Sequence, residues 1–245
     1  MIAGTQGDIP AATALVTEGR ALVQQIADPV ARAGVAIGDG FTALAVGQLD
    51  HACACLQDAI DEHISPTMRG GALIILGWAQ ELRGESEPAF DCYEKALALS
   101  ERHGESMYRM LALLSIGAAK WRHGDADHAI PMLRRCLELA RLVNDRRTAA
   151  YCLETLAWVA GKANSPRTAA VMLGAAAGLS HGVGSTSVPF AHLRVHHEEC
   201  EDLARSALGA EQFGAAYEEG SSLNFNDATR LGLKVELEEA ERRDP

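Results

Sequence analysis

The chain has 245 residues, of which 48% are hydrophobic and 5% aromatic, and its formal net charge is −11. Helix-favouring residues dominate, proline is scarce and long alternating runs of Val, Ile and Thr are absent, so the composition indicates an all-α fold. The acidic balance argues against direct nucleic-acid binding by this chain, because such binding depends on Lys and Arg that neutralise phosphates.

The ends of the chain and its cysteines indicate a cytoplasmic setting. The first twenty residues lack a charged start followed by an apolar run, and no apolar stretch is long enough to span a membrane. We therefore expect neither a signal peptide nor a membrane partner. The six cysteines lack paired spacing, which favours a reducing compartment.

A pattern of small residues recurs every 37 to 40 positions. In each repeat a small residue is followed seven positions later by Gly or Asn, and five further by Ala. The four repeats are Gly40/Gly47/Ala52, Gly77/Gly84/Ala89, Gly117/Gly124/Ala129 and Ala157/Asn164/Ala169. Such a period predicts a stack of helical hairpins, each repeat contributing one pair of helices.

The N-terminal segment fits half of a further repeat. Counting back 40 positions from Gly47 gives Gly7, which is followed by the pattern of a turn and a second helix. The first helix of that repeat is absent, so an apolar face would remain uncovered. We expect the natural chain to continue upstream or to pair this face with another chain.

The second repeat shows why small residues are needed. Residues 71–83 and 86–97 read as two amphipathic helices, and Gly84 suits the left-handed turn between them. Gly77 and Ala89 are predicted to face each other, where the lack of bulk permits close helix packing.

These repeats resemble the tetratricopeptide repeat over about residues 5–180. The Leu76-Gly77 pair and Tyr93 match its signature, whereas Ala157 and Asn164 depart from it. The longer period is similar to that of bacterial regulators of the MalT type. The resemblance implies a right-handed α-solenoid of tetratricopeptide-like helical hairpins over residues 1–180.

The tail is predicted to form a C-terminal helical cap over residues 181–245. A Gly/Ser-rich break precedes a long helix over about residues 190–208, and residues 204–228 follow the pattern A-x-x-x-L-G … F … A-x-x-E-G … L. This segment resembles the C-terminal end of actinobacterial LuxR-type transcriptional regulators, in which a signal-transduction ATPase precedes the repeats. The resemblance implies an upstream ATPase module in cis or in trans, since this chain has no phosphate-binding loop.

Two local patterns resemble catalytic or metal sites. The run from Gly178 to Gly182 fits the G-x-S-x-G pattern around Ser180, but an alanine-rich helix precedes it where a hydrolase needs a strand. His192, His196 and Cys200 recur at intervals of four, which could give two ligands to zinc. We expect helix packing in both places, and we predict no enzyme activity and no cofactor or metal.

The cysteines and the acidic pairs have simpler explanations. Cys55 and Cys92 occupy one column of the repeat, and Cys136 stands where other repeats have Ala, so we expect all three to be small apolar filler. The pairs Glu198-Glu199, Glu218-Glu219 and Glu238-Glu239 are adjacent on predicted helices and do not face each other, so we expect solvated surface.

The first helices of the repeats supply the predicted binding surface. In the tetratricopeptide family these helices line a concave groove, and mapping its positions onto this chain collects all three tryptophans. The predicted groove residues are Ile37, Phe41, Ile74, Trp78, Glu81, Trp121, Arg122, Glu154, Trp158 and Lys162, with Leu44 and Leu114 beside them. Indole rings with an N–H donor suit peptide or effector binding, although Trp78 and Trp158 could equally pack against the next repeat.

Three functions remain open from the sequence. We favour a non-catalytic regulatory interaction domain that binds a protein, peptide or small effector in this groove. A structural scaffold that forms homo-oligomers through the N-terminal half-repeat is the alternative. A hydrolase or zinc-dependent protein, resting on Ser180 or on His192, His196 and Cys200, is the remote one.

Overall fold

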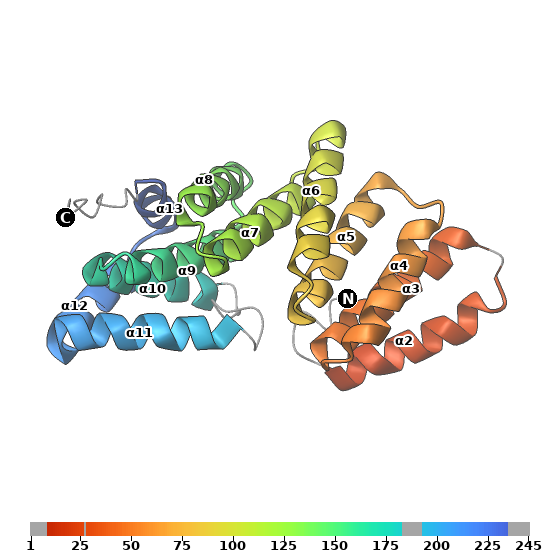
Figure 1. Cartoon of the computed structure of the whole chain (residues 1–245), viewed down its shortest axis with the longest axis horizontal. Helices are drawn as coiled ribbons and strands as arrows, with labels where there is room; N and C mark the ends of the chain where they lie inside the picture. The colour runs from red at the N-terminus through yellow and green to blue at the C-terminus, as the bar shows by residue number, and fades with distance from the viewer. Residues whose placement is uncertain (1–8, 27, 183–192, 235–245) are drawn as a thin grey trace. The chain divides into compact units, whose positions relative to one another are not determined.

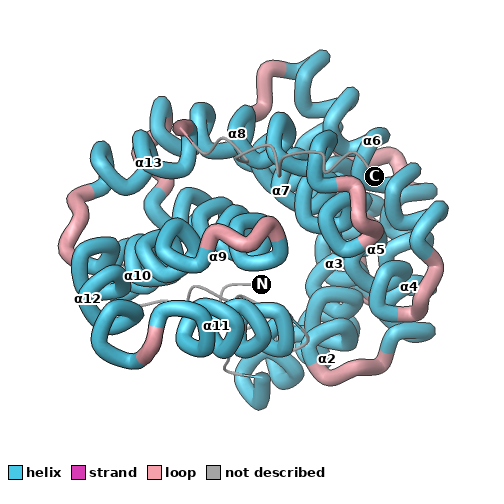
Figure 2. The backbone as a smooth tube through the Cα atoms, turned by 60° about the vertical axis from the view of Figure 1, so that its left-hand side comes forward, coloured by secondary structure: helices cyan, strands magenta, loops and turns pink. Residues whose placement is uncertain are grey.

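The structure is a computed structural model that describes residues 9–26, 28–182 and 193–234. These residues form helices joined by short loops and contain no strand, as Figures 1 and 2 show. The helices are α2 (Ile9–Val23), α3 (Pro29–Ala45), α4 (Leu49–Asp61), α5 (Pro66–Leu82), α6 (Ser86–His103), α7 (Met107–Arg122), α8 (Ala126–Leu142), α9 (Arg146–Lys162), α10 (Pro166–His181), α11 (Arg194–Leu208), α12 (Ala210–Ser221) and α13 (Phe225–Leu233). The all-α prediction is confirmed for this part of the chain.

The chain forms two compact units, Met1–Ile116 and Gly117–Pro245, with the boundary inside α7. We call them the N-terminal unit and the C-terminal unit. Within each unit, helices that follow one another in sequence pack as pairs, including α3 with α4, α5 with α6, and α9 with α10. This is the predicted arrangement of consecutive helical hairpins. The predicted domain boundary at residue 180 falls near the end of α10, within the C-terminal unit.

The turn inside each hairpin lies at the Gly or Asn position that the repeat pattern predicts. Gly47, Gly84, Gly124 and Asn164 all adopt positive φ angles, between 59° and 81°. The amide of the residue after each one donates to a carbonyl five positions back, as in the bond of 2.9 Å from Glu85 N to Gln80 O. This is the Schellman geometry that ends a helix in a left-handed residue, and Gly adopts it at no steric cost.

Close packing of the two helices explains why the first helix of each pair has a small residue at the same position of the repeat. A Cβ atom added at Gly40 would lie 2.6 Å from Cγ of Leu56, and one added at Gly117 would lie 2.7 Å from Cγ of Leu133. At Gly77 the nearest atoms belong to the ring of Tyr93. The residue sixteen positions on therefore fills the space above each glycine. Ala89, the predicted partner of Gly77, is buried, but the atoms nearest to Gly77 belong to Tyr93.

The C-terminal helices pack on the last hairpin. α12 runs against α10 so closely that a Cβ atom added at Gly174 or Gly178 would collide with backbone atoms of Tyr217 or Ser221. α11 contacts both α9 and α10, and α13 contacts α8, α9 and α10. The predicted helix over residues 190–208 is described from Arg194 onwards. α11, α12 and α13 thus pack as part of the C-terminal unit.

At the other end, α2 packs against α3, as expected for the second helix of a half-repeat. Gly7, from which that half-repeat was counted, lies outside the described residues. α3 begins at Pro29 after Asp28, whose carboxylate accepts a hydrogen bond of 2.9 Å from the amide of Val30. No helix in the described ranges has the length and apolar character needed to cross a membrane.

Candidate functional site

The predicted groove residues of the N-terminal unit are largely committed to internal contacts. Ile37, Phe41 and Ile74 are buried, and they contribute to the core of this unit. Trp78 is half-buried, and its Nε1 donates a hydrogen bond of 2.8 Å to Oγ of Ser115. The carboxylate of Glu81 accepts a bond of 2.9 Å from the hydroxyl of Tyr93. These five predicted groove residues therefore offer little surface to a partner.

The predicted residues of the C-terminal unit come together around two tryptophans. The ring centroids of Trp121 and Trp158 lie 5.5 Å apart, and the imidazole of His196 lies 5.1 Å from Trp121 and 5.5 Å from Trp158. We call these three rings the aromatic cluster. Trp158 is buried, whereas Trp121 and His196 are half-buried and reach the surface. The cluster joins α7, α9 and α11.

A shallow hollow lies over the aromatic cluster. Its lining residues are Trp121, Trp158, Lys162, His196, Glu199, Cys200 and Leu203. Leu203 is 46% exposed at this hollow, and Lys162 and Glu199 form an exposed ion pair of 3.6 Å beside it. The hollow therefore combines an apolar floor with a charged rim of both signs. Arg122 is half-buried on α7, one residue beyond Trp121.

Glu154, another predicted groove residue, lies under the cluster rather than on the surface. Its side chain is only 1% exposed. Its Oε1 accepts a bond of 2.9 Å from Nε1 of Trp158 and lies 2.6 Å from Nδ1 of His197. Its Oε2 is buried with no hydrogen-bond partner in the described part of the chain. Glu154 thus fixes Trp158 and α11 instead of offering an anchor to a partner.

The pKa values of the two adjacent histidines of α11, His196 and His197, are shifted in opposite directions. The hydrogen bond to Glu154 raises the pKa of His197 above its ordinary value, against a smaller opposing effect of burial. Burial lowers the pKa of His196, and the nearby Arg122 lowers it further. Burial also raises the pKa of Cys200 to about 12, so this cysteine stays a thiol.

The pattern around Ser180 does not have the geometry of a nucleophile site. Ser180 lies inside α10 and is buried, so the strand and sharp turn that a hydrolase nucleophile requires are missing there. Gly178 in the same pattern serves the close approach of α12. His192 lies outside the described residues, and Cys200 donates to the carbonyl of Ala157 at 3.3 Å, which is a packing contact between α11 and α9.

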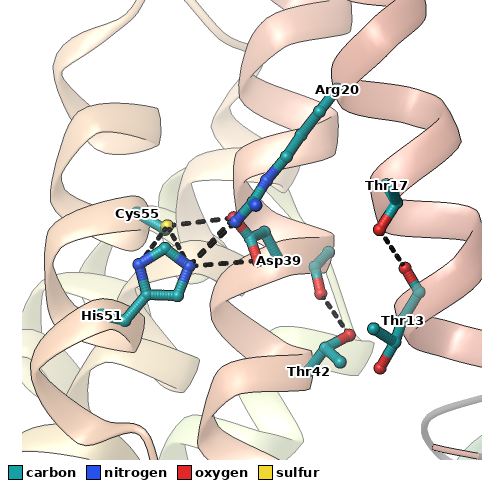
Figure 3. A network of polar contacts seen from close by, with 8 residues as sticks. Thr13, Thr17, Arg20, Asp39, Thr42, His51 and Cys55 are labelled. Atoms are coloured by element: carbon teal, nitrogen blue, oxygen red, sulfur yellow. Dashed lines mark hydrogen bonds and ion pairs between the residues drawn. The ribbon is translucent and has the colours of Figure 1, made fainter. Parts of the chain in front are cut away.

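A polar cluster that the sequence analysis did not single out lies in the N-terminal unit. We call it the Asp39 cluster. It consists of Arg20 on α2, Asp39 on α3, and His51 and Cys55 on α4, which Figure 3 shows pointing toward one another. Arg20 donates to Asp39 and lies 2.9 Å from Nε2 of His51, and Cys55 Sγ lies 3.3 Å from Oδ2 of Asp39. His51 and Cys55, one turn apart on a helix, are the signal that could have revealed it.

The Asp39 cluster corrects the interpretation of one cysteine. Cys92 and Cys136 are buried, as predicted, and the thiol of Cys92 also donates to Oε1 of Gln80 at 3.3 Å. Cys55 is only half-buried and contacts the polar groups of Asp39 and His51, so its role goes beyond filling space. The described acidic pairs, Glu198-Glu199 and Glu218-Glu219, are exposed as predicted. The third pair, Glu238-Glu239, lies outside the described residues.

The arrangement of the Asp39 cluster does not suit nucleophilic catalysis. In a Cys-His-Asp triad the acid and the nucleophile contact different ring nitrogens of the histidine. Here Asp39 Oδ1 lies 3.3 Å and Cys55 Sγ lies 3.5 Å from the same atom, Nε2 of His51, and the sulfur is farther, at 3.8 Å, from Nδ1. Burial and the Asp39 carboxylate raise the pKa of Cys55 to about 11, which removes the reactive thiolate at neutral pH.

No model of a protein family matches the chain, and no curated protein has a significantly similar sequence.

Proposed function

We propose that this chain is a non-catalytic interaction module of a cytoplasmic regulatory protein, and that the hollow over the aromatic cluster binds a peptide segment of a partner. The observation that carries this proposal is the surface position of Trp121 and His196 beside exposed Leu203 and the Lys162–Glu199 pair. Tryptophan is among the residues that contribute most to binding energy at protein interfaces, and such interfaces commonly have a polar rim.

The shape and charges of the hollow favour a peptide over a small effector. It is too shallow to enclose a small effector, but an apolar side chain of a peptide can lie across Trp121 and Leu203. Opposite charges on the peptide would then pair with Lys162 and Glu199 at the rim. The free state of all six cysteines is compatible with the cytoplasmic part of this proposal.

The regulatory context of this proposal comes from the tail. The segment that resembles the end of LuxR-type regulators occupies α11 to α13, and these helices pack on the last hairpin. In such a regulator, a partner bound at the hollow would bias the upstream ATPase module. An in-frame ATPase in the coding sequence upstream of residue 1 would support this context, and an unrelated upstream sequence would remove it.

A selection from a random-peptide display library tests the binding site itself. We expect the full chain to enrich peptides with a shared apolar residue, and Trp121→Ala to weaken their binding by at least tenfold, about 1.4 kcal/mol or more. Leu142→Ala is the matched control, because Leu142 is an exposed apolar residue of the same unit outside the hollow. Enriched peptides that bind Trp121→Ala and Lys162→Glu as well as they bind the unchanged chain would contradict the proposal.

A second candidate function, a self-association scaffold, is favoured by one observation on α2. Leu15 and Leu22 are 60% and 51% exposed and lie seven residues apart, on one face of this helix, and Ile26 just beyond the helix is 51% exposed. An exposed apolar face is what the half-repeat was expected to leave. Sedimentation over a range of concentrations tests it: we expect dimers that Leu22→Glu dissociates, and a monomer at every concentration would exclude this function.

A further inference from the structure

The Asp39 cluster places three different metal-ligating atoms around one point. Sγ of Cys55 lies 3.3 Å from Oδ2 of Asp39 and 3.5 Å from Nε2 of His51, and Nε2 of His51 lies 3.2 Å from Oδ2 of Asp39. These are the only described His, Cys, Asp and Glu residues grouped closely enough, in threes or more, to hold a metal ion. Figure 3 shows that the carboxylate, ring and thiol converge between α3 and α4.

These separations match a tetrahedral zinc site. Zinc binds sulfur at about 2.3 Å and nitrogen or oxygen at about 2.0 to 2.2 Å, which places neighbouring ligand atoms about 3.3 to 3.7 Å apart at tetrahedral angles. The three atoms therefore already have nearly the mutual spacing that an ion between them requires. Two ligands one turn apart on α4 and a third from the paired helix α3 hold this face of the tetrahedron.

The repeat itself does not require a carboxylate at this position. Asp39 immediately precedes the small residue of its repeat, and the equivalent residues in the other three repeats are Leu76, Ile116 and Leu156. All three are buried apolar side chains. Asp39 therefore puts a charged group into a core position, where burial is unfavourable unless a cation compensates it. Arg20 supplies such a cation in the structure, and a metal ion is a second group able to compensate the same carboxylate.

We propose that Asp39, His51 and Cys55 form a binding site for Zn²⁺ or a chemically similar divalent transition-metal ion. The mixed set of thiolate, imidazole and carboxylate suits zinc, and the hard cations Mg²⁺ and Ca²⁺ prefer oxygen ligands alone. A water molecule takes the fourth position, as in zinc sites with three protein ligands.

Arg20 acts as the competing cation of this site. Its guanidinium group donates to Asp39 and contacts His51, so it supplies the positive charge that the metal would bring. The side chain is 49% exposed on the surface of α2, and it can turn into solvent without disturbing the core. On metal binding the Arg20 contact with Asp39 breaks, the thiol proton of Cys55 passes to solvent, and a metal–sulfur bond forms.

Cobalt titration of the full-length, tag-free, reduced chain tests this site, because Co²⁺ bound by thiolate gives a charge-transfer band. We expect about one ion per chain, displaced by Zn²⁺. Cys55→Ser should abolish the band, and Asp39→Asn should weaken binding at least tenfold. Cys53→Ser is the matched control on the same helix and should leave the titration unchanged. Arg20→Gln should tighten binding, because it removes the competing cation.

Two results would overturn the proposal. One is a band that persists in Cys55→Ser or disappears equally in Cys53→Ser, which would indicate metal bound by other thiols. The other is the absence of a saturable band in the unchanged chain. Circular dichroism of each variant establishes folding, and the near-isosteric Cys55→Ser decides the question if Asp39→Asn fails to fold.

Discussion

The two units each bury one carboxylate on the first helix of a hairpin, and they stabilise it in different ways. Asp39 in the N-terminal unit is surrounded by Arg20, His51 and Cys55. Glu154 in the C-terminal unit accepts from Trp158, pairs with His197, and keeps one oxygen without a partner among the described residues. These are the only buried carboxylates in the described ranges.

The difference shows how exposure decides the cost of losing a partner. Arg20 is permanently charged and half exposed, and solvent can replace part of what it provides. Glu154 is almost fully buried, so solvent cannot replace His197. The polar contacts of the N-terminal unit are therefore adaptable, while those of the C-terminal unit hold α11 against α9.

The largest expected effect comes from removing His197. His197→Ala would leave the Glu154 carboxylate buried and poorly compensated, and we expect it to lower the free energy of unfolding by about 3 kcal/mol. Urea denaturation followed by tryptophan fluorescence measures this change. The double variant Glu154→Leu/His197→Ala should recover much of the loss, because it removes the buried charge as well. A loss below about 0.5 kcal/mol in the single variant would contradict this account.

The second largest loss of unfolding free energy is expected from removing the indole N–H of Trp158. Trp158→Phe keeps an aromatic ring in the cluster but removes the donor to Glu154, so we expect a loss of about 2 kcal/mol. The matched control is Trp78→Phe in the N-terminal unit, whose indole donates to the neutral hydroxyl of Ser115. That variant should lose only about 1 kcal/mol. Equal losses in the two variants would show that the charge of Glu154 is unimportant.

Removing Arg20 should lower the free energy of unfolding less than removing His197 does. Arg20→Ala leaves Asp39 with His51 and Cys55 as neighbours, and the exposed edge of the cluster admits water. We expect a loss of about 1 kcal/mol in urea denaturation, reduced further by added salt. Lys95→Ala is a suitable control, since its ion pair with Asp91 is fully on the surface. A loss as large as that of His197→Ala would abolish the distinction between the units.

The smallest effect is a dependence of stability on pH that the two units do not share. The raised pKa of His197 means that its stabilising contribution is complete below the ordinary value of 6.5 and is lost as pH rises through the folded-state pKa. The lowered pKa of Asp39 gives a contribution that is present above 3.8 and lost only as pH falls below that value. Of these two residues, His197 is therefore the one whose contribution should change near neutral pH.

Denaturation at a series of pH values, for the unchanged chain and for His197→Gln, isolates this contribution. The difference in unfolding free energy between the two should shrink as pH rises above 6.5. Subtraction is needed because His196, with its lowered pKa, is less stabilising as pH falls, and because Glu201 and Glu198 also face His197. A difference that is constant from pH 6 to pH 9 would contradict the role given to the Glu154 pair.

Much of the fold could be predicted because it depends on local geometry. The positive φ angles at Gly47, Gly84, Gly124 and Asn164 follow from a rule that applies within one turn of a helix. The need for Gly40, Gly77 and Gly117 follows from the repetition of one helix pair. The turn residue and the small helix residue recur in each repeat, so an alignment of the repeats with one another reveals both.

The sites were harder to predict because they depend on which side chains meet across several helices. The first-helix positions predicted for a groove include Ile37, Phe41 and Ile74, whose apolar side chains are buried by neighbouring helices. Trp121 and Trp158 do meet, but their third ring, His196, comes from α11, outside the repeats.

The helices, their pairing into hairpins and the positions of the turns could be predicted from the sequence, because they depend on contacts between residues close in the chain. The convergence of Arg20, Asp39, His51 and Cys55 is seen only in the folded chain, and so is the position of Glu154 beneath Trp158 and His197. Burial and charge compensation depend on the side chains of three helices at once, so the spacing of His51 and Cys55 along α4 indicates only part of one cluster.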